Sequence, residues 1–193
     1  KVDMGAGAED DVGTAEMPAG ERGRALGGAQ GVRPQDLTVG ITERPRHGEM
    51  NGPVRETRGG VRLVSGGEGG GGVACSEPGT GLDLYMGMGG GPEGVLAAAA
   101  LKCMGGQMYG RLLFRNDDER GRAAKAGITD LDRIYGRDEM VTQDVIFAAT
   151  GVTGGTLLPG VQREPGWLTT ETLIMRSKSG SVRRINYRTP TSS

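Results

Sequence analysis

A glycine run directly before a run of helix formers constrains this chain more than any other feature. Residues 86–103 read MGMGGGPEGVLAAAALKC, with glycines crowded into the first half and alanines into the second. Glycine adopts backbone conformations that other residues avoid, whereas Ala and Leu are strong helix formers. Pro92 suits a first helical turn, where its missing N–H has no partner, and Gly105 suits a helix end. The stretch predicts a strand exit followed by a helix over residues 92–104.

Strand-like and helix-like segments alternate along most of the chain. Helical signals occur at 92–104 and at 116–127, and residues 130–140 indicate a turn and a short acidic helix. The glycine-rich residues 66–72 predict no ordered structure, and residues 144–151 predict a strongly buried strand. Further β-branched or apolar runs predict strands at 37–42, 61–65, 82–87 and 108–114, and paired strands at 169–177 and 181–188. This alternation is typical of an α/β fold with a mixed sheet.

Composition sets limits on stability, compartment and partners. The chain has 38 glycines among 193 residues, and only 4% of its residues are aromatic, whereas average glycine usage is about 7%. Each ordered glycine loses more backbone entropy than other residues, so we expect low stability. A net charge of −1 and the lack of a long apolar run argue against nucleic-acid and membrane partners. Cys75 and Cys103 have no zinc-site spacing, and we expect buried free thiols in a reducing cytoplasm.

The chain divides into three segments by composition. Residues 1–36 are polar, glycine-rich and net acidic, which predicts a poorly ordered segment. Residues 37–188 carry the strand and helix signals and form the expected domain, and residues 189–193 form a tail.

The join at Pro92 and Glu93 has the chemistry of an anion site. Free N–H groups and the helix dipole favour an anion at a helix start, and glycines let the backbone approach it closely. Glu93 would repel a phosphate there unless a divalent cation lay between the two groups. The alternative is that Glu93 is a helix-start acid that faces solvent. No Lys-Ser or Lys-Thr follows the glycines, so this is not a P-loop.

The loop ERPRH, residues 43–47, offers a second anion-binding group. Arg44 and Arg46 flank the rigid Pro45, and a guanidinium binds phosphate with two hydrogen bonds. A solvated basic turn is the alternative. His47 is the single histidine, which excludes a three-histidine zinc site, and we expect His47 to be part of the loop structure rather than a catalytic base. The arginines near the C-terminus alternate with apolar residues and predict the solvated face of a hairpin.

Several long segments together resemble one enzyme family. RPRH, MGMGGGPEGVLAAAALKCMGGQM, DVIFAATGVTGGTLL and TTETLIMRSKSGSVRRI resemble the C-terminal half of class II fructose-1,6-bisphosphatase. The family includes a cyanobacterial type that also hydrolyses sedoheptulose 1,7-bisphosphate. The resemblance runs from about residue 37 to 188. It implies a layered α-β-α sugar-phosphatase fold, present here in part, in an enzyme of gluconeogenesis, glycerol metabolism or the Calvin cycle. It also implies that the 1-phosphate of fructose 1,6-bisphosphate is hydrolysed with Mn²⁺ or Mg²⁺.

The resemblance also assigns roles to particular positions. Glu93 matches a metal-binding glutamate, and Gly90 matches a substrate-binding glycine. The family's phosphate-binding loop matches Arg44, Pro45 and Arg46. Its Asp-Gly-Asp substrate segment corresponds to Gly66, Gly67 and Glu68, so two side chains differ there. No catalytic residue is assigned.

The family's N-terminal half, which supplies most of the metal carboxylates, has no counterpart in the resemblance. We therefore expect a partial phosphatase with little activity on its own, and a sugar bisphosphate as its ligand. One alternative is a non-catalytic module that binds sugar phosphates or other anions, and another is a glycine-rich chain that does not fold stably. Homo-oligomer formation and the choice between six- and seven-carbon substrates stay open.

Overall fold

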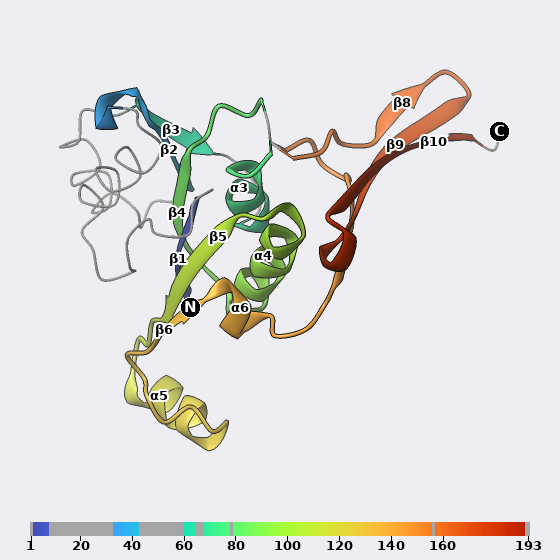
Figure 1. Ribbon diagram of the computed structural model, residues 1–193. Coiled ribbons are helices and arrows are strands. Elements are labelled where there is room, and N and C mark those ends of the chain that lie inside the picture. Colours follow the sequence, from blue (N-terminus) through green and yellow to red (C-terminus); the bar gives the residue numbers. More distant parts are fainter. Residues whose placement is uncertain are drawn as a thin grey trace.

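Two β-sheets enclose a pair of helices in the computed structural model (Figure 1). The structure describes residues 2–7, 33–42, 60–64, 68–77, 79–155 and 157–191. The first sheet has six strands in the order β3-β2-β4-β1-β5-β6. Their bounds are Val2–Gly7 (β1), Thr38–Thr42 (β2), Gly60–Val64 (β3), Leu84–Gly89 (β4), Gln107–Leu112 (β5) and Ile134–Gly136 (β6).

The second sheet contains the C-terminal strands. β9 pairs with β10, β7 and the short β8, all antiparallel. The bounds are Ile146–Thr150 (β7), Gln162–Glu164 (β8), Trp167–Arg176 (β9) and Ser181–Pro190 (β10). The helices are Pro34–Asp36 (η1), Glu68–Ala74 (α3), Gly91–Met104 (α4), Asp117–Lys125 (α5), Arg137–Met140 (α6) and Ser177–Ser179 (η3).

Strands β2, β3 and β4 run parallel, and β1 lies antiparallel between β4 and β5. Backbone and side chain together hold the start of β4 against β2. Thr38 N–H donates to the Asp83 carboxylate at 2.7 Å, and Asp83 N–H donates to Thr38 C=O at 3.0 Å. The predicted mixed α/β class is confirmed, while the specific sugar-phosphatase layering stays a prediction.

Helix α4 is the centre of the structure because both sheets pack on it. Ala97, Ala98 and Leu101 lie in one buried cluster with residues of the first sheet. Ala100 and Cys103 lie in a second cluster with residues of β9. A helix covered on two sides buries apolar residues on more than one face, which explains the alanines and Leu101, whereas Val95 and Leu96 are 47% and 58% exposed.

The predicted signals for α4 and α5 are confirmed in detail. Gly90 is the extended N-cap of α4, and Gly105 ends the helix in a left-handed conformation at φ 81°. Asn116 caps α5 by accepting a hydrogen bond from Glu119 N–H at 3.0 Å. No residue of α5 is buried, and the helix projects from the end of the first sheet (Figure 1).

The prediction that residues 66–72 lack ordered structure is wrong from Glu68 onward, where α3 begins. α3 packs against both α4 and β4. A Cβ at Gly71 would overlap the Tyr85 ring, so only glycine lets the helix approach β4 this closely. Tertiary packing therefore outweighs the poor helix propensity of the glycines.

The prediction of a strand at 144–151 is confirmed, but the prediction that this strand is strongly buried is wrong. β7 is an edge strand of the second sheet, and Ile146 is 71% exposed. Only the face with Phe147 and Ala149 packs towards α4. An apolar run signals burial on both faces, but this strand has one covered face.

Near the N-terminus, the structure adds a strand that the sequence patterns did not predict. Residues 2–7 form β1, whereas residues 8–32 lie outside the described residues. The three-segment division of the chain therefore stays a prediction.

Both cysteines are free and buried, as predicted. Within the described ranges, no helix is long and apolar enough to cross a membrane.

Candidate substrate and metal site

Three neighbouring parallel strands bring the predicted site segments towards one edge of the first sheet. β2 pairs with β3 so that Thr42 lies opposite Val64, and with β4 so that Ile41 lies opposite Met86. The carboxyl ends of all three strands therefore meet at the same edge. Ligands of open α/β sheets bind outside such an edge.

Each of these strands leads directly into a predicted substrate segment. The arginine loop follows β2, the glycine segment follows β3, and Gly90 follows β4. Residues 43–59 and 65–67 lie outside the described residues, so the positions of Arg44, Pro45, Arg46, Gly66 and Gly67 stay predictions. Glu68 is the first residue of α3, and only its backbone is described.

Gly90 and Glu93 lie together at the start of α4. The Gly90 backbone is extended, and its C=O accepts from Gly94 N–H at 3.1 Å, which begins the helix. Glu93 lies in the first turn and is exposed. Its carboxylate folds back over Gly90, so closely that a Cβ built at that glycine would overlap Glu93 Oε2. Gly90 thus makes room for the carboxylate at the helix start.

The same helix start is open to a ligand. A Cβ placed at Gly91 would meet nothing within 4 Å, so the backbone there can be approached closely. Pro92 has no N–H to offer, but the helix dipole favours negative charge here. The Glu93 carboxylate supplies part of this negative charge itself. This geometry agrees both with a metal-binding role and with the alternative of an exposed helix-start acid.

The described residues do not make a metal site on their own. No group of three or more His, Cys, Asp or Glu side chains among them could hold a metal ion. Mg²⁺ and Mn²⁺ need several oxygen ligands, and Glu93 contributes one carboxylate. This part of the chain therefore does not fit a two-metal centre.

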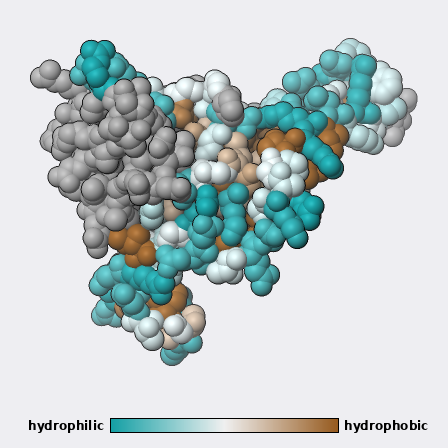
Figure 2. All heavy atoms as spheres, viewed as in Figure 1, coloured by the Kyte–Doolittle hydropathy of each residue, from teal (hydrophilic) through white to brown (hydrophobic). Residues whose placement is uncertain are grey.

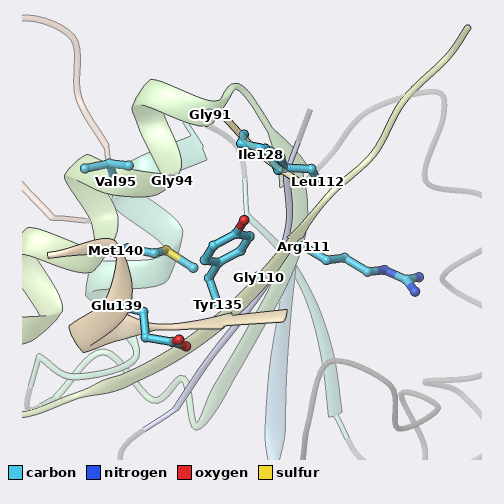
Figure 3. Close-up of a pocket in the computed structure, with 10 residues that line it drawn as sticks. All are labelled: Gly91, Gly94, Val95, Gly110, Arg111, Leu112, Ile128, Tyr135, Glu139 and Met140. Carbon is cyan, nitrogen blue, oxygen red and sulfur yellow. The ribbon is translucent and has the colours of Figure 1, made fainter. Parts of the chain in front are cut away.

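A pocket of about 370 Å³ lies beside the helix start and was not predicted from the sequence (Figure 3). The Tyr135 ring points into it, whereas the Arg111 side chain points away. Three glycines line the pocket and leave space that larger side chains would fill: Gly91, Gly94 and Gly110. They come together only because α4 packs beside β5, so their positions in the sequence did not predict a pocket. The remaining lining residues are Val95, Leu112, Ile128, Glu139 and Met140.

Glu139 is the one carboxylate among the residues that line this pocket, and it is already engaged by other groups. Glu139 accepts from Gly136 N–H at 2.8 Å and pairs with Arg133 at 2.5 Å. The Gly136 hydrogen bond, followed by the Arg133 hydrogen bond, lowers the pKa of Glu139. The pocket is therefore mainly apolar, and it suits the sugar-phosphate ligand less well than the open helix start does.

Comparison with known proteins identifies the family. The family described as bacterial fructose-1,6-bisphosphatase, glpX-encoded, matches residues 1–189. The chain belongs to this family. The predicted family is thus confirmed. The restriction of the resemblance to the family's C-terminal half stays a prediction, because the match also includes residues 1–36.

Two cyanobacterial relatives carry the name D-fructose 1,6-bisphosphatase class 2/sedoheptulose 1,7-bisphosphatase. The protein from Microcystis aeruginosa (strain NIES-843) is 34% identical over 165 residues, which are 79% of this chain and 48% of the relative. The protein from Synechococcus elongatus (strain PCC 7942) is 35% identical over 164 residues, or 78% of this chain and 48% of the relative. The chain therefore spans about half the length of these relatives of the bacterial fructose-1,6-bisphosphatase family.

Proposed function

We propose that this chain forms the substrate-holding part of a sugar-bisphosphate phosphatase. The reaction is hydrolysis of the 1-phosphate of fructose 1,6-bisphosphate, with sedoheptulose 1,7-bisphosphate as a second substrate. One observation carries the proposal: three adjacent parallel strands end at one edge, and a predicted substrate segment follows each of them. The names of the relatives support the same reaction. A cytoplasmic role in gluconeogenesis or glycerol metabolism belongs to this proposal.

The chain's own groups would bind and orient the substrate. The guanidinium groups of Arg44 and Arg46 would hold one phosphate, and the first turn of α4 at Gly90 would lie near the other. Holding both ends of the sugar fixes the reacting phosphate in place, which lowers the entropic part of the barrier.

A divalent cation, Mn²⁺ or Mg²⁺, would polarise the phosphoryl group and activate water. We give Glu93 one ligand position for this ion and assign it no step of the reaction, because the described residues do not complete the site. We accordingly expect the chain alone to bind sugar bisphosphate and to turn it over slowly.

A second function fits the same geometry. A module that binds sugar phosphates without hydrolysing them needs the strand-end segments and the helix start but no metal centre. The lack of a metal-binding cluster among the described side chains favours this alternative for the chain by itself.

The test is phosphate release from fructose 1,6-bisphosphate in the presence of Mn²⁺, with binding of the same sugar followed by calorimetry. Glu93→Ala is compared with Asp117→Ala, which removes an equivalent first-turn acid from α5. Turnover that Glu93→Ala abolishes and Asp117→Ala preserves supports the phosphatase. Binding without turnover in the parent chain supports the binding module. If the parent chain neither binds nor hydrolyses the sugar, both functions are refuted.

A further inference from the structure

The apolar pocket beside the start of α4 has no role in the proposed phosphatase reaction. Its volume of about 370 Å³ lies in the range of small-molecule sites, about 300–1,000 Å³. Leu112 at the end of β5 and Ile128 after α5 both line it (Figure 3). Hydrophobic surface is in view where the first sheet leads into α5 (Figure 2). A cavity of this size and surface suits an apolar ligand of one or two rings.

The charged residues of the lining do not offer their charge to a ligand. The Arg111 side chain points away from the pocket (Figure 3). Glu139 accepts from Gly136 N–H at 2.8 Å and is neutralised by Arg133 at 2.5 Å. A charged ligand would lose its hydration here without gaining a partner of opposite charge, and that loss is costly. The ligand that fits this pocket is therefore uncharged.

Tyr135 supplies an aromatic ring and one polar atom. The ring points into the pocket (Figure 3), and Arg133 Cζ lies 5.2 Å from the ring centre. The Tyr135 hydroxyl makes no hydrogen bond with any other residue in the described part of the chain. Aromatic rings attract one another in offset or edge-on arrangements, and a methionine sulfur, such as that of Met140, also packs well on rings. These features favour an aromatic ligand with one group that can pair with the hydroxyl.

Three glycines open the walls of the pocket to a flat molecule. Gly91 and Gly94 line it from α4, and Gly110 lines it from β5. A Cβ at Gly91 would meet nothing within 4 Å, so the free space continues up to the backbone. A planar ring can lie directly on a backbone that carries no side chains. Gly91 and Gly94 also flank Glu93 in sequence, so a bound ring would contact the turn that carries this carboxylate.

The walls of the pocket are held in place by contacts of their own. Ile128 N–H donates to Ala123 C=O at 3.0 Å, which fixes the residues that follow α5. Lys102 Nζ of α4 donates to Val141 C=O at 2.6 Å, which ties the end of α6 to α4. A ligand that enters a preformed pocket pays little for ordering the protein around it.

We propose that this pocket binds a small uncharged aromatic molecule with a single hydrogen-bonding group. Its ring lies against the glycines of α4 and β5, and its polar group pairs with the Tyr135 hydroxyl. The proposal is independent of the phosphatase reaction, and its test needs no sugar phosphate.

The probe is 2-naphthol, a fused pair of rings with one hydroxyl, and its binding is measured by calorimetry at pH 7. The matched probe is 2-naphthoate, which carries a charged carboxylate on the same rings and should bind about tenfold more weakly. Hydrogen exchange locates the bound probe. 2-Naphthol should slow the exchange of the amides at 91–95 and 134–136 and leave those of β9 unchanged.

Matched substitutions on one helix test whether the probe enters this pocket. Val95 and Leu96 are 47% and 58% exposed, and Val95 lines the pocket whereas Leu96 does not. Val95→Trp fills the cavity and should abolish binding of 2-naphthol, whereas Leu96→Trp should preserve it. Tyr135→Phe keeps the ring and removes the hydroxyl, so it should weaken binding about fivefold.

Circular dichroism checks that each variant folds, and Tyr135→Phe tests the site even if Val95→Trp does not fold. A parent chain that binds no 2-naphthol overturns the proposal. Equal affinity for 2-naphthol and 2-naphthoate overturns it as well, because the pocket would then not select an uncharged ligand. Unchanged binding by Tyr135→Phe or by folded Val95→Trp would show that the probe lies elsewhere and would also overturn it.

Discussion

Gly71→Ala tests the packing that turns a glycine run into helix α3. A Cβ at this position would overlap the ring of Tyr85, a side chain that is 2% exposed and packed in the core. Alanine improves helix propensity by about 0.5–1 kcal/mol over glycine. Overpacking of a tight core costs about 1–3 kcal/mol, because the ring or the helix must shift. The cost exceeds the gain, so Gly71→Ala should lower the free energy of unfolding by about 1 kcal/mol.

The same substitution in open space provides the control. Gly121 lies in α5, and a Cβ there would meet nothing within 4 Å. Gly121→Ala should therefore stabilise its helix by about 0.5–1 kcal/mol. Urea unfolding gives the free energy for both variants, and amide hydrogen exchange gives the local protection of α3 and α5. Tyr85→Leu should relieve the overlap, so it should also reduce the cost of Gly71→Ala in a double-mutant cycle.

The reasoning is refuted if Gly71→Ala stabilises the chain as much as Gly121→Ala does. That result would mean that α3 does not lie against β4 in solution. Exchange of the α3 amides at the rate of an unfolded chain would lead to the same conclusion.

Three further predictions follow from other parts of the structure. Gly90→Ala should leave the free energy of unfolding within about 0.5 kcal/mol, because Glu93 can swing away, but it should weaken Mn²⁺-dependent sugar binding in calorimetry; unchanged binding would show that the carboxylate position is irrelevant. The hydrogen bond from Arg137 lowers the pKa of Asp138 below its ordinary value of 3.8, so its contribution to stability is complete above that pH and is lost as the pH falls further. Urea unfolding at stepwise lower pH should show this loss in the parent chain and a smaller one in Asp138→Asn. Burial raises the pKa of the Cys75 thiol, so iodoacetamide at pH 8 should label it only after unfolding; rapid labelling of the folded chain would place this thiol at the surface.

Local signals in the sequence predict the elements whose stability is decided locally. The ends of α4 follow from Pro92 and Gly105, and Asn116 with the acids after it predicts α5. The hairpin of β9 and β10 follows from two β-rich runs around Gly180, which is left-handed at φ 60°. Caps and turns act over a few residues, so their effect can be read without knowing the fold.

Features that depend on distant partners could not be predicted in this way. The structure of α3 depends on Tyr85, which follows it in the chain but lies in a different element. The exposure of Ile146 depends on which face of its sheet is covered. The pocket at Tyr135 exists only where α4, β5, β6 and α6 come together. None of these contacts has a fixed spacing in sequence.

The candidate site likewise has features that the sequence predicts and features that depend on the tertiary structure. The sequence by itself determined the family, and it predicts the chemistry of the segments at residues 44–46, 66–68 and 90–93 and a helix start that can face an anion. Only the tertiary structure decided that the three preceding strands are parallel neighbours ending at one edge. It also decided that Glu93 folds over Gly90, and that β10 pairs with β9 alone among the described strands. Strand order and register are set by which apolar faces pack together across the chain, and a local sequence pattern does not contain that information.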